Sequence, residues 1–238
     1  MIRVTYLDHS GFLVELDTVC LLFDWWRGEL PPLPNKPLTV FVSHRHADHF
    51  QPGIFQLDDG RREVRFVLGK DIKLSAHNLE KWKVPPRTAE KCVRVRRNER
   101  IFLPGVEILA LPSTDTGAAF LARADGKAVY HAGDLNWWHW EEDLPADSKN
   151  MEANFKRYLE PLRGQTLDLA FAPLDPRLGD SFGLGFRYLL ETADIRRIFP
   201  MHQWGDYSAT ERFLTENPEF SDRVIPAERP GQSWEFAE

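Results

Sequence analysis

Four side chains that can bind a metal lie within six residues of this chain, directly after an apolar segment. Residues 39–42 have the composition of a buried strand, and His44, His46, Asp48 and His49 follow at once. A turn at the end of a strand can direct several side chains to one point. Imidazoles and carboxylates are the donors that Zn²⁺ and other first-row cations prefer. The motif therefore predicts a metal site, against the alternative of a solvated polar loop.

One loop offers only part of a coordination shell, so further ligands must come from other strand ends. Asp134 follows the strand-like residues 128–132, and Gly133 between them allows close approach of the backbone. His202 follows a second strand-like segment, residues 195–199. Both positions suit metal ligands. Taken alone, Asp134 could instead cap a turn, and His202 could be a hydrogen-bonded core histidine.

Strand-like segments dominate the chain to about residue 134, and helical periodicity follows. Asp125 and Gly126 predict a tight hairpin, because Gly tolerates the positive φ that the reversal demands. A helix is expected to begin with Asp147 or Ser148 as N-cap. Strands are expected at residues 12–16, 19–23, 39–43, 93–96, 106–111, 119–122, 128–132, 167–172, 195–199 and 233–236, and further helices at 185–193 and from a capping box at Ser208 and Glu211.

Composition is that of an ordinary globular protein, and we expect one domain over residues 1–238. A net charge of -6 disfavours nucleic acid and anionic membranes as partners. The beginning of the chain does not resemble a signal peptide, and no apolar stretch reaches the ~20 residues of a spanning helix. Cys20 and Cys92 form no disulfide framework. We therefore expect a soluble, cytoplasmic protein with a small-molecule substrate. The sequence leaves open whether it forms a homo-oligomer.

The motifs resemble, in their order along the chain, those of the metallo-β-lactamase fold superfamily, and most closely its branch related to ascorbate-6-phosphate lactonase. They lie at residues 6–14, 22–26, 44–49, 132–134 and 200–202, so the resemblance covers nearly the whole chain. It implies an α+β fold, a four-layer αββα sandwich of two mixed β-sheets with outer helices and the site at one edge. It also implies a metal-dependent hydrolase.

The resemblance further implies the ligands of two metals. His44 and His46 would hold metal 1, Asp48, His49 and His202 would hold metal 2, and Asp134 would bridge them. A metal-bound hydroxide between the ions would be the nucleophile, with Asp48 and Asp134 as catalytic residues. Zn²⁺ is the expected ion, at one site or at both.

The chain departs from the family at the third histidine of metal 1. Residues 112–117 contain no histidine; Thr114 stands at the expected position and Asp115 beside it. Asp115 could complete metal 1, metal 1 could be weak and exchangeable, or metal 2 alone could be kept. A carboxylate at metal 1 would favour Mn²⁺ or Fe²⁺ relative to Zn²⁺. Alternatively, Asp115 could only cap the turn.

An aromatic pocket with cationic groups is expected around the metals, since several of the 8 Trp lie close to the ligand motifs. His9 would line this pocket or orient a ligand. The alternatives are indoles that cover the core and arginines in ordinary surface ion pairs. The expected substrate-binding residues are Trp25, Trp26, Trp137, Arg45 and Arg177.

Three functions follow from these expectations. The first is hydrolysis of a small molecule, a lactone or a phosphate ester, by a metal-bound hydroxide. The second is a phosphodiesterase or nuclease, which the acidic balance of the chain disfavours. The third is a non-catalytic binding protein with a degenerate metal 1 site, for which the missing histidine is the argument.

Overall fold

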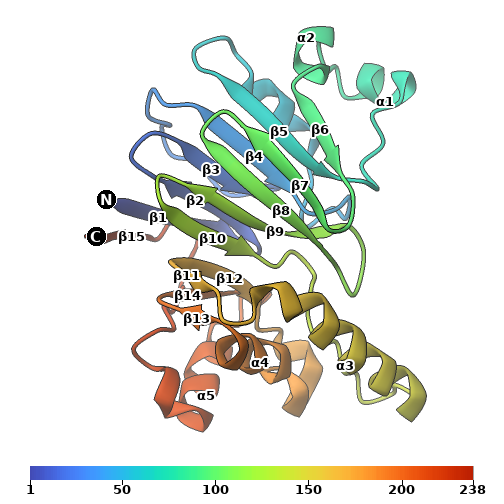
Figure 1. Ribbon diagram of the computed structural model, residues 1–238, viewed down its shortest axis with the longest axis vertical. Helices are drawn as coiled ribbons and strands as arrows, with labels where there is room; N and C mark the ends of the chain where they lie inside the picture. Colours follow the sequence, from blue (N-terminus) through green and yellow to red (C-terminus); the bar gives the residue numbers. More distant parts are fainter. Residues whose placement is uncertain (238) are drawn as a thin grey trace.

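Two β-sheets pack face to face, with helices on their outer surfaces, in the computed structural model, which describes residues 1–237 (Figure 1). The first sheet has the order β15 (Ser233–Phe236), β1 (Ile2–Asp8), β2 (Gly11–Glu15), β3 (Cys20–Phe23), β4 (Leu38–Val42), β5 (Val64–Gly69) and β6 (Cys92–Val95). The second has the order β14 (Ile198–Met201), β12 (Leu169–Pro173), β10 (Lys127–His131), β9 (Ala118–Ala124), β8 (Val106–Pro112) and β7 (Glu99–Leu103). A short parallel pair joins β11 (Thr166–Leu167) and β13 (Asp194–Ile195).

Both sheets are mixed, which confirms the expected α+β sandwich. Strands β3 to β6 run parallel, as do β10, β12 and β14, and the other pairs of the two sheets are antiparallel. The helices are α1 (Ala76–Lys81), α2 (Pro86–Ala89), α3 (Pro145–Leu159), α4 (Leu184–Thr192) and α5 (Ser208–Glu216), with 3₁₀ turns η1 (Pro52–Leu57), η2 (Glu160–Leu162), η3 (Pro176–Ser181) and η4 (Pro218–Phe220). Helices α3, α4 and α5 lie beside β12 and β14 (Figure 1).

Strands β3, β4 and β5 of the first sheet are buried on both faces, which explains their nearly continuous apolar sequence. In β3, Leu21 and Phe23 join the core between the two sheets. Cys20 and Leu22 point the other way, into a second core that Phe55 of η1 helps to cover. Because successive side chains of a strand alternate between faces, two cores need apolar residues at every position.

Two expected N-caps are wrong, and the hairpin is confirmed. Asp125 and Gly126 join β9 to β10 with φ of 51° and 72°, as a tight reversal requires. Helix α3 begins at Pro145, before Asp147 and Ser148, because Pro presets the helical φ and needs no hydrogen bond to its nitrogen. Ser208 does not cap α5. Tyr207 is the N-cap, and the Ser208 hydroxyl donates a hydrogen bond to Asp206 instead.

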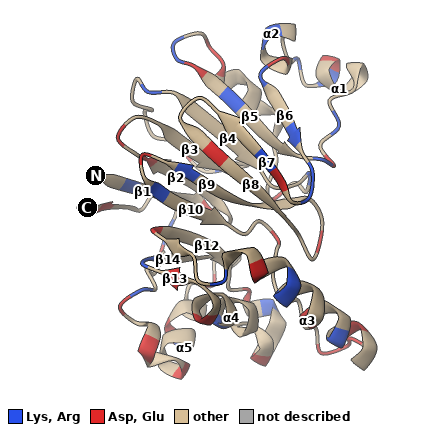
Figure 2. Ribbon diagram, in the orientation of Figure 1, with Lys and Arg blue, Asp and Glu red and all other residues tan. Residues whose placement is uncertain are grey.

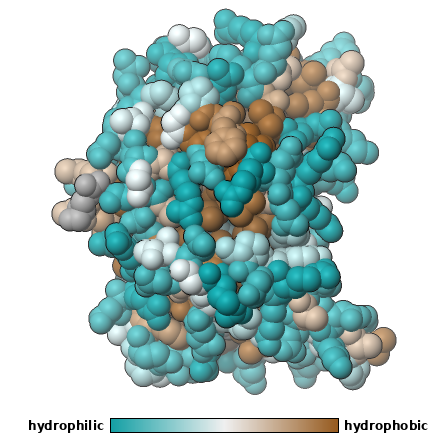
Figure 3. Space-filling view, viewed as in Figure 1, coloured by the Kyte–Doolittle hydropathy of each residue, from teal (hydrophilic) through white to brown (hydrophobic). Residues whose placement is uncertain are grey.

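Charges of both signs are interspersed over the visible face of the molecule (Figure 2). The same face is mostly hydrophilic, with an apolar area over the strands in its upper half (Figure 3). Phe102 on the edge strand β7 is 73% exposed. Within residues 1–237, no helix is both long and apolar enough to cross a membrane.

Candidate metal centre

The loop after β4 is the support on which two other loops of the centre pack. Gly117 and Gly133 have φ of 74° and 51°, a backbone conformation that favours glycine. A Cβ atom at Gly117 would lie 2.0 Å from the carbonyl oxygen of Ser43, and one at Gly133 would lie 2.6 Å from Ser43 Cβ. The two glycines thus allow the loops that carry Asp115 and Asp134 to approach the loop of His44–His49.

Two groups of four side chains result, and in each group the donor atoms lie within 4.8 Å of one another. One group is His44, His46, Asp115 and Asp134, and the other is His9, Asp48, His49 and His202. Asp134 faces both groups. Its Oδ2 lies 3.3 Å from Nε2 of His44, and its Oδ1 lies 3.1 Å from Nε2 of His49. The distance from Asp134 Oδ1 to His202 Nε2 is 3.4 Å.

Several buried donor atoms of these two groups lack hydrogen-bond partners within the described part of the chain. They are the Nε2 atoms of His9, His44, His49 and His202 and the Oδ1 atom of Asp134. Buried polar atoms without partners are rare in folded proteins because they lose the hydration that water provided. A divalent cation bound between them would satisfy these atoms with the ligands that it prefers. The residues therefore fit a metal centre.

Carboxylates behind two of the histidines, His49 and His202, fix the direction of their imidazoles. Asp24 is fully buried, and its Oδ2 lies 2.7 Å from Nδ1 of His49. The same carboxylate accepts hydrogen bonds from the Ser43 backbone N–H and hydroxyl, at 2.7 and 2.6 Å. Asp175 Oδ2 lies 2.8 Å from Nδ1 of His202. A histidine that donates its Nδ1 proton to a carboxylate presents an unprotonated Nε2, which is the form that binds metal.

The electrostatics of the centre follow from burial and close pairing. Burial alone would raise the pKa of Asp134, but the nearby His49, with His44 and His202, holds it well below its usual value. Burial alone would lower the pKa of His49, but Asp134 and Asp24 raise it well above its usual value. The two carboxylates thus favour the protonated form of His49. A bound cation would displace that proton, so metal binding is coupled to proton release.

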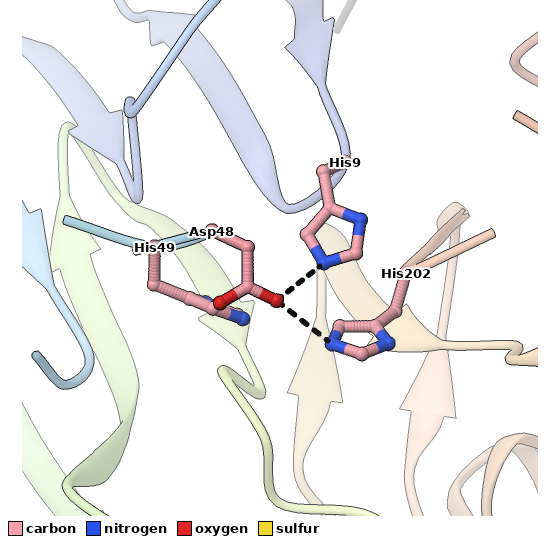
Figure 4. A group of neighbouring side chains, drawn as sticks. All are labelled: His9, Asp48, His49 and His202. Atoms are coloured by element: carbon pink, nitrogen blue, oxygen red, sulfur yellow. Dashed lines mark ion pairs between the residues drawn. The ribbon is translucent and has the colours of Figure 1, made fainter. Parts of the chain in front are cut away.

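His9 is the residue whose position the sequence left open, and it lies within the second group. Its Nε2 is 3.4 Å from Oδ2 of Asp48, and its ring centroid is 4.2 Å from that of His202 (Figure 4). The backbone of His9 has a φ of 55° and its N–H donates to the Tyr6 hydroxyl at 2.8 Å. Asp24 and His202 also have positive φ. Such backbone conformations are uncommon outside glycine and concentrate at functional sites.

Asp115, rather than Thr114, lies with the first group. The Thr114 hydroxyl is used elsewhere, since it donates to the Asn136 carbonyl oxygen at 2.7 Å. Asp115 Oδ2 lies 3.7 Å from Nδ1 of His46, and both side chains are nearly half exposed. The first group is therefore more open to solvent than the second, in which His9, His49 and His202 are buried.

A cavity of about 520 Å³ opens over both groups and reaches Arg177, Trp138, Trp140 and Trp204. Of the expected substrate-binding residues, Arg177 lies in this cavity and the other four do not line it.

Three of those four side chains lie elsewhere, whereas Trp26 packs beside His9 of the second group. Trp25 packs on the outer core of the first sheet, and Trp137 packs against Phe155 of α3. Trp26 lies edge-on to His9 with ring centroids 6.4 Å apart. Arg45 lines a separate cavity of about 450 Å³.

The sandwich of mixed sheets has the metallo-β-lactamase fold, and its centre of histidines and aspartates, together with relatives named metal-dependent hydrolases, supports a metal-dependent hydrolase. The chain belongs to the beta-lactamase superfamily, because the sequence model of the family described as "Beta-lactamase superfamily domain" matches residues 22–165. The expected resemblance to this superfamily is thereby confirmed.

Similar proteins agree with this assignment. A "UPF0173 metal-dependent hydrolase" of Heliobacterium modesticaldum is 27% identical over an alignment that covers 91% of each chain. Igni18, a metallo hydrolase from Ignicoccus hospitalis, has a TM-score of 0.62 and 19% identity over 99% of each chain. CmlA from Streptomyces venezuelae, a diiron β-hydroxylase, has a TM-score of 0.62 and 13% identity over 99% of this chain and 54% of its own. The two solved structures show a shared fold.

Proposed function

We propose that the protein hydrolyses a small carboxylic ester, with a lactone as the favoured form, at a two-metal centre. One observation carries the proposal: Asp134 directs one carboxylate oxygen toward each group of donors, as a bridging ligand must. His44, His46 and Asp115 would complete the shell of metal 1. The shell of metal 2 would be completed by His9, Asp48, His49 and His202. His9 is thereby added to the ligand set that the resemblance implied.

The chain's own residues hold the reacting groups in place. When bound, two divalent cations would activate a water molecule and polarise the ester carbonyl. Asp48 and Asp134 both border the cavity, so we assign them the orientation of the attacking water. Trp138 is buried beside the donor atoms and restricts the access of water to them. The indole N–H of Trp138 donates a hydrogen bond to the Asp134 carbonyl oxygen at 3.1 Å.

A carboxylic ester fits the cavity better than a phosphate ester. Among the described residues that line the cavity, Arg177 is the only one with a positively charged side chain of the Lys or Arg type. Its side chain already donates three hydrogen bonds to Asp175. Asp143 and Asp147 also line the cavity and would repel a phosphate group. The neutral carbonyl of a lactone meets no such repulsion.

A panel of substrates tests this choice. We expect the protein loaded with Mn²⁺ or Zn²⁺ to hydrolyse γ- and δ-lactones with a higher kcat/KM than p-nitrophenyl phosphate or bis(p-nitrophenyl) phosphate. Chelation of the metal should abolish the reaction, and added metal should restore it. Cleavage of the phosphate esters without cleavage of any lactone would favour a phosphoesterase instead.

Asp115 should decide the occupancy and identity of metal 1. We expect Asp115→Ala to lower the metal content from two ions per chain to one, because the more exposed first group loses a donor. Asp115→His should restore the second ion and shift its preference from Mn²⁺ or Fe²⁺ toward Zn²⁺, since imidazole is the softer ligand. Elemental analysis after dialysis against each metal measures both effects. Equal metal content in Asp115→Ala and the unmodified protein would exclude Asp115 as a ligand.

We also propose that residues 1–238 form one domain that works in the cytoplasm. The core between the sheets joins residues from both ends of the chain, such as Val4 and Val224. Cys20 and Cys92 are both free thiols, and free thiols are typical of a reducing compartment.

A further inference from the structure

Part of the cavity wall comes from residues outside the proposed metal shells. Most of this wall belongs to one segment, between the end of β10 and the second turn of α3. This segment contributes Trp138, Trp140, Asp143, Asp147 and Met151. The wall would therefore contact the part of a substrate that lies away from the scissile bond.

Three indole side chains line this wall. The rings of Trp138 and Trp140 are nearly parallel, with an interplanar angle of 5° and centroids 6.3 Å apart. Trp204 is 48% exposed, although its large apolar surface would be more stable if covered. The Arg177 guanidinium lies 4.3 Å from the centroid of Trp204 and 5.8 Å from that of Trp140. These rings thus already hold one cation, as expected from the negative potential of an indole face.

The charge of the wall is negative. Neither Asp143 nor Asp147 forms an ion pair with a Lys or Arg among residues 1–237. Asp143 accepts a hydrogen bond from the Trp140 backbone N–H at 3.0 Å, which holds its carboxylate near the indoles. The one cation, Arg177, is balanced by the buried carboxylate of Asp175. Two carboxylates without a Lys or Arg partner therefore border the cavity beside aromatic rings.

We propose that this wall is a subsite for a positively charged nitrogen, so that the substrate is an ester or lactone bearing an ammonium group. The proposal rests on the proposed hydrolase function for the position of the ester, but the ammonium site stands on the wall alone. Indole faces and carboxylates both favour a cation, and an ammonium group with apolar substituents can use both at once. Asp143 and Asp147 are then specificity residues, which select the substrate without touching the reacting bond.

Binding of a charged probe and its neutral isostere tests the subsite without any reaction. We would titrate the metal-loaded protein with choline and with 3,3-dimethylbutan-1-ol, which has the same shape and no charge, using ligand-observed NMR. The dissociation constant for choline should be about tenfold lower. In the double variant Asp143→Asn with Asp147→Asn, the two constants should become nearly equal. Asn keeps the oxygen that accepts from the Trp140 N–H, so the segment should stay folded.

A matched control removes the same number of negative charges from the same segment, at residues outside the cavity. Glu141 and Glu142 are exposed and do not line this cavity, so Glu141→Gln with Glu142→Gln should leave the preference for choline unchanged. Equal binding of the two probes to the unmodified protein would overturn the subsite, as would a preference that survives in the aspartate variant. If the preference behaves as expected while no lactone is hydrolysed, the proposed reaction fails and the subsite remains.

Discussion

Replacement of Asp134 by alanine is expected to remove both metals and to lower hydrolysis by roughly 10³-fold or more. The reason is that Asp134 is the one donor residue whose two carboxylate oxygens face different groups. Loss of this side chain leaves His44 and His49 without the charge that would help to hold a cation between them. Metal content by elemental analysis and lactone hydrolysis at saturating Mn²⁺ measure the two effects.

The fold of this variant should survive. In the alanine variant His49 keeps its second carboxylate partner, because Asp24 Oδ2 lies 2.7 Å from its Nδ1, so neither group is left unpaired in the core. Circular dichroism should therefore match that of the unmodified protein. The exposed Glu142→Gln change is a suitable control, because Glu142 lies outside the cavity and belongs to neither group of donors. Two tightly bound metals in the Asp134→Ala protein would contradict the bridging role.

The sequence predicted best those site residues that directly follow a buried strand. His44 and His202 follow β4 and β14 within two residues, and Asp134 follows β10 within three. Their positions depend on the strand pattern, which the apolar segments reveal. These residues come together in the structure as the motifs suggested.

Other features depend on local conformation that no pattern reveals. Thr114 and Asp115 are neighbours, and the hydrogen bond of Thr114 to Asn136 decides which of them turns to the centre. His9 reaches the second group only because its backbone adopts a positive φ. The same limit applies to the tryptophans. Trp137 and Trp138 are adjacent in sequence, yet Trp138 lines the cavity whereas Trp137 packs against α3.

The buried carboxylate of Asp24 should have the largest effect on stability. Asp24→Ala would leave the Ser43 N–H, the Ser43 hydroxyl and Nδ1 of His49 without their common acceptor in a site that water does not reach. Breaking a buried charged network of this kind costs about 3–5 kcal/mol. For a chain of this length, that loss corresponds to a decrease in Tm of roughly 10 °C. Thermal unfolding followed by circular dichroism measures it.

Asp24→Asn separates this structural effect from an effect on the metal. Its amide oxygen can still accept from the Ser43 N–H, so most of the stability should be kept. Its NH₂ group would face Nδ1 of His49 and donate to it, which moves the imidazole proton to Nε2. A protonated Nε2 cannot bind a cation, so this variant should lose affinity for metal 2 by about 10–100-fold while its Tm without metal stays close to that of the unmodified protein. Unchanged affinity for metal 2 would show that Asp24 supports the fold and does not set the tautomer of His49.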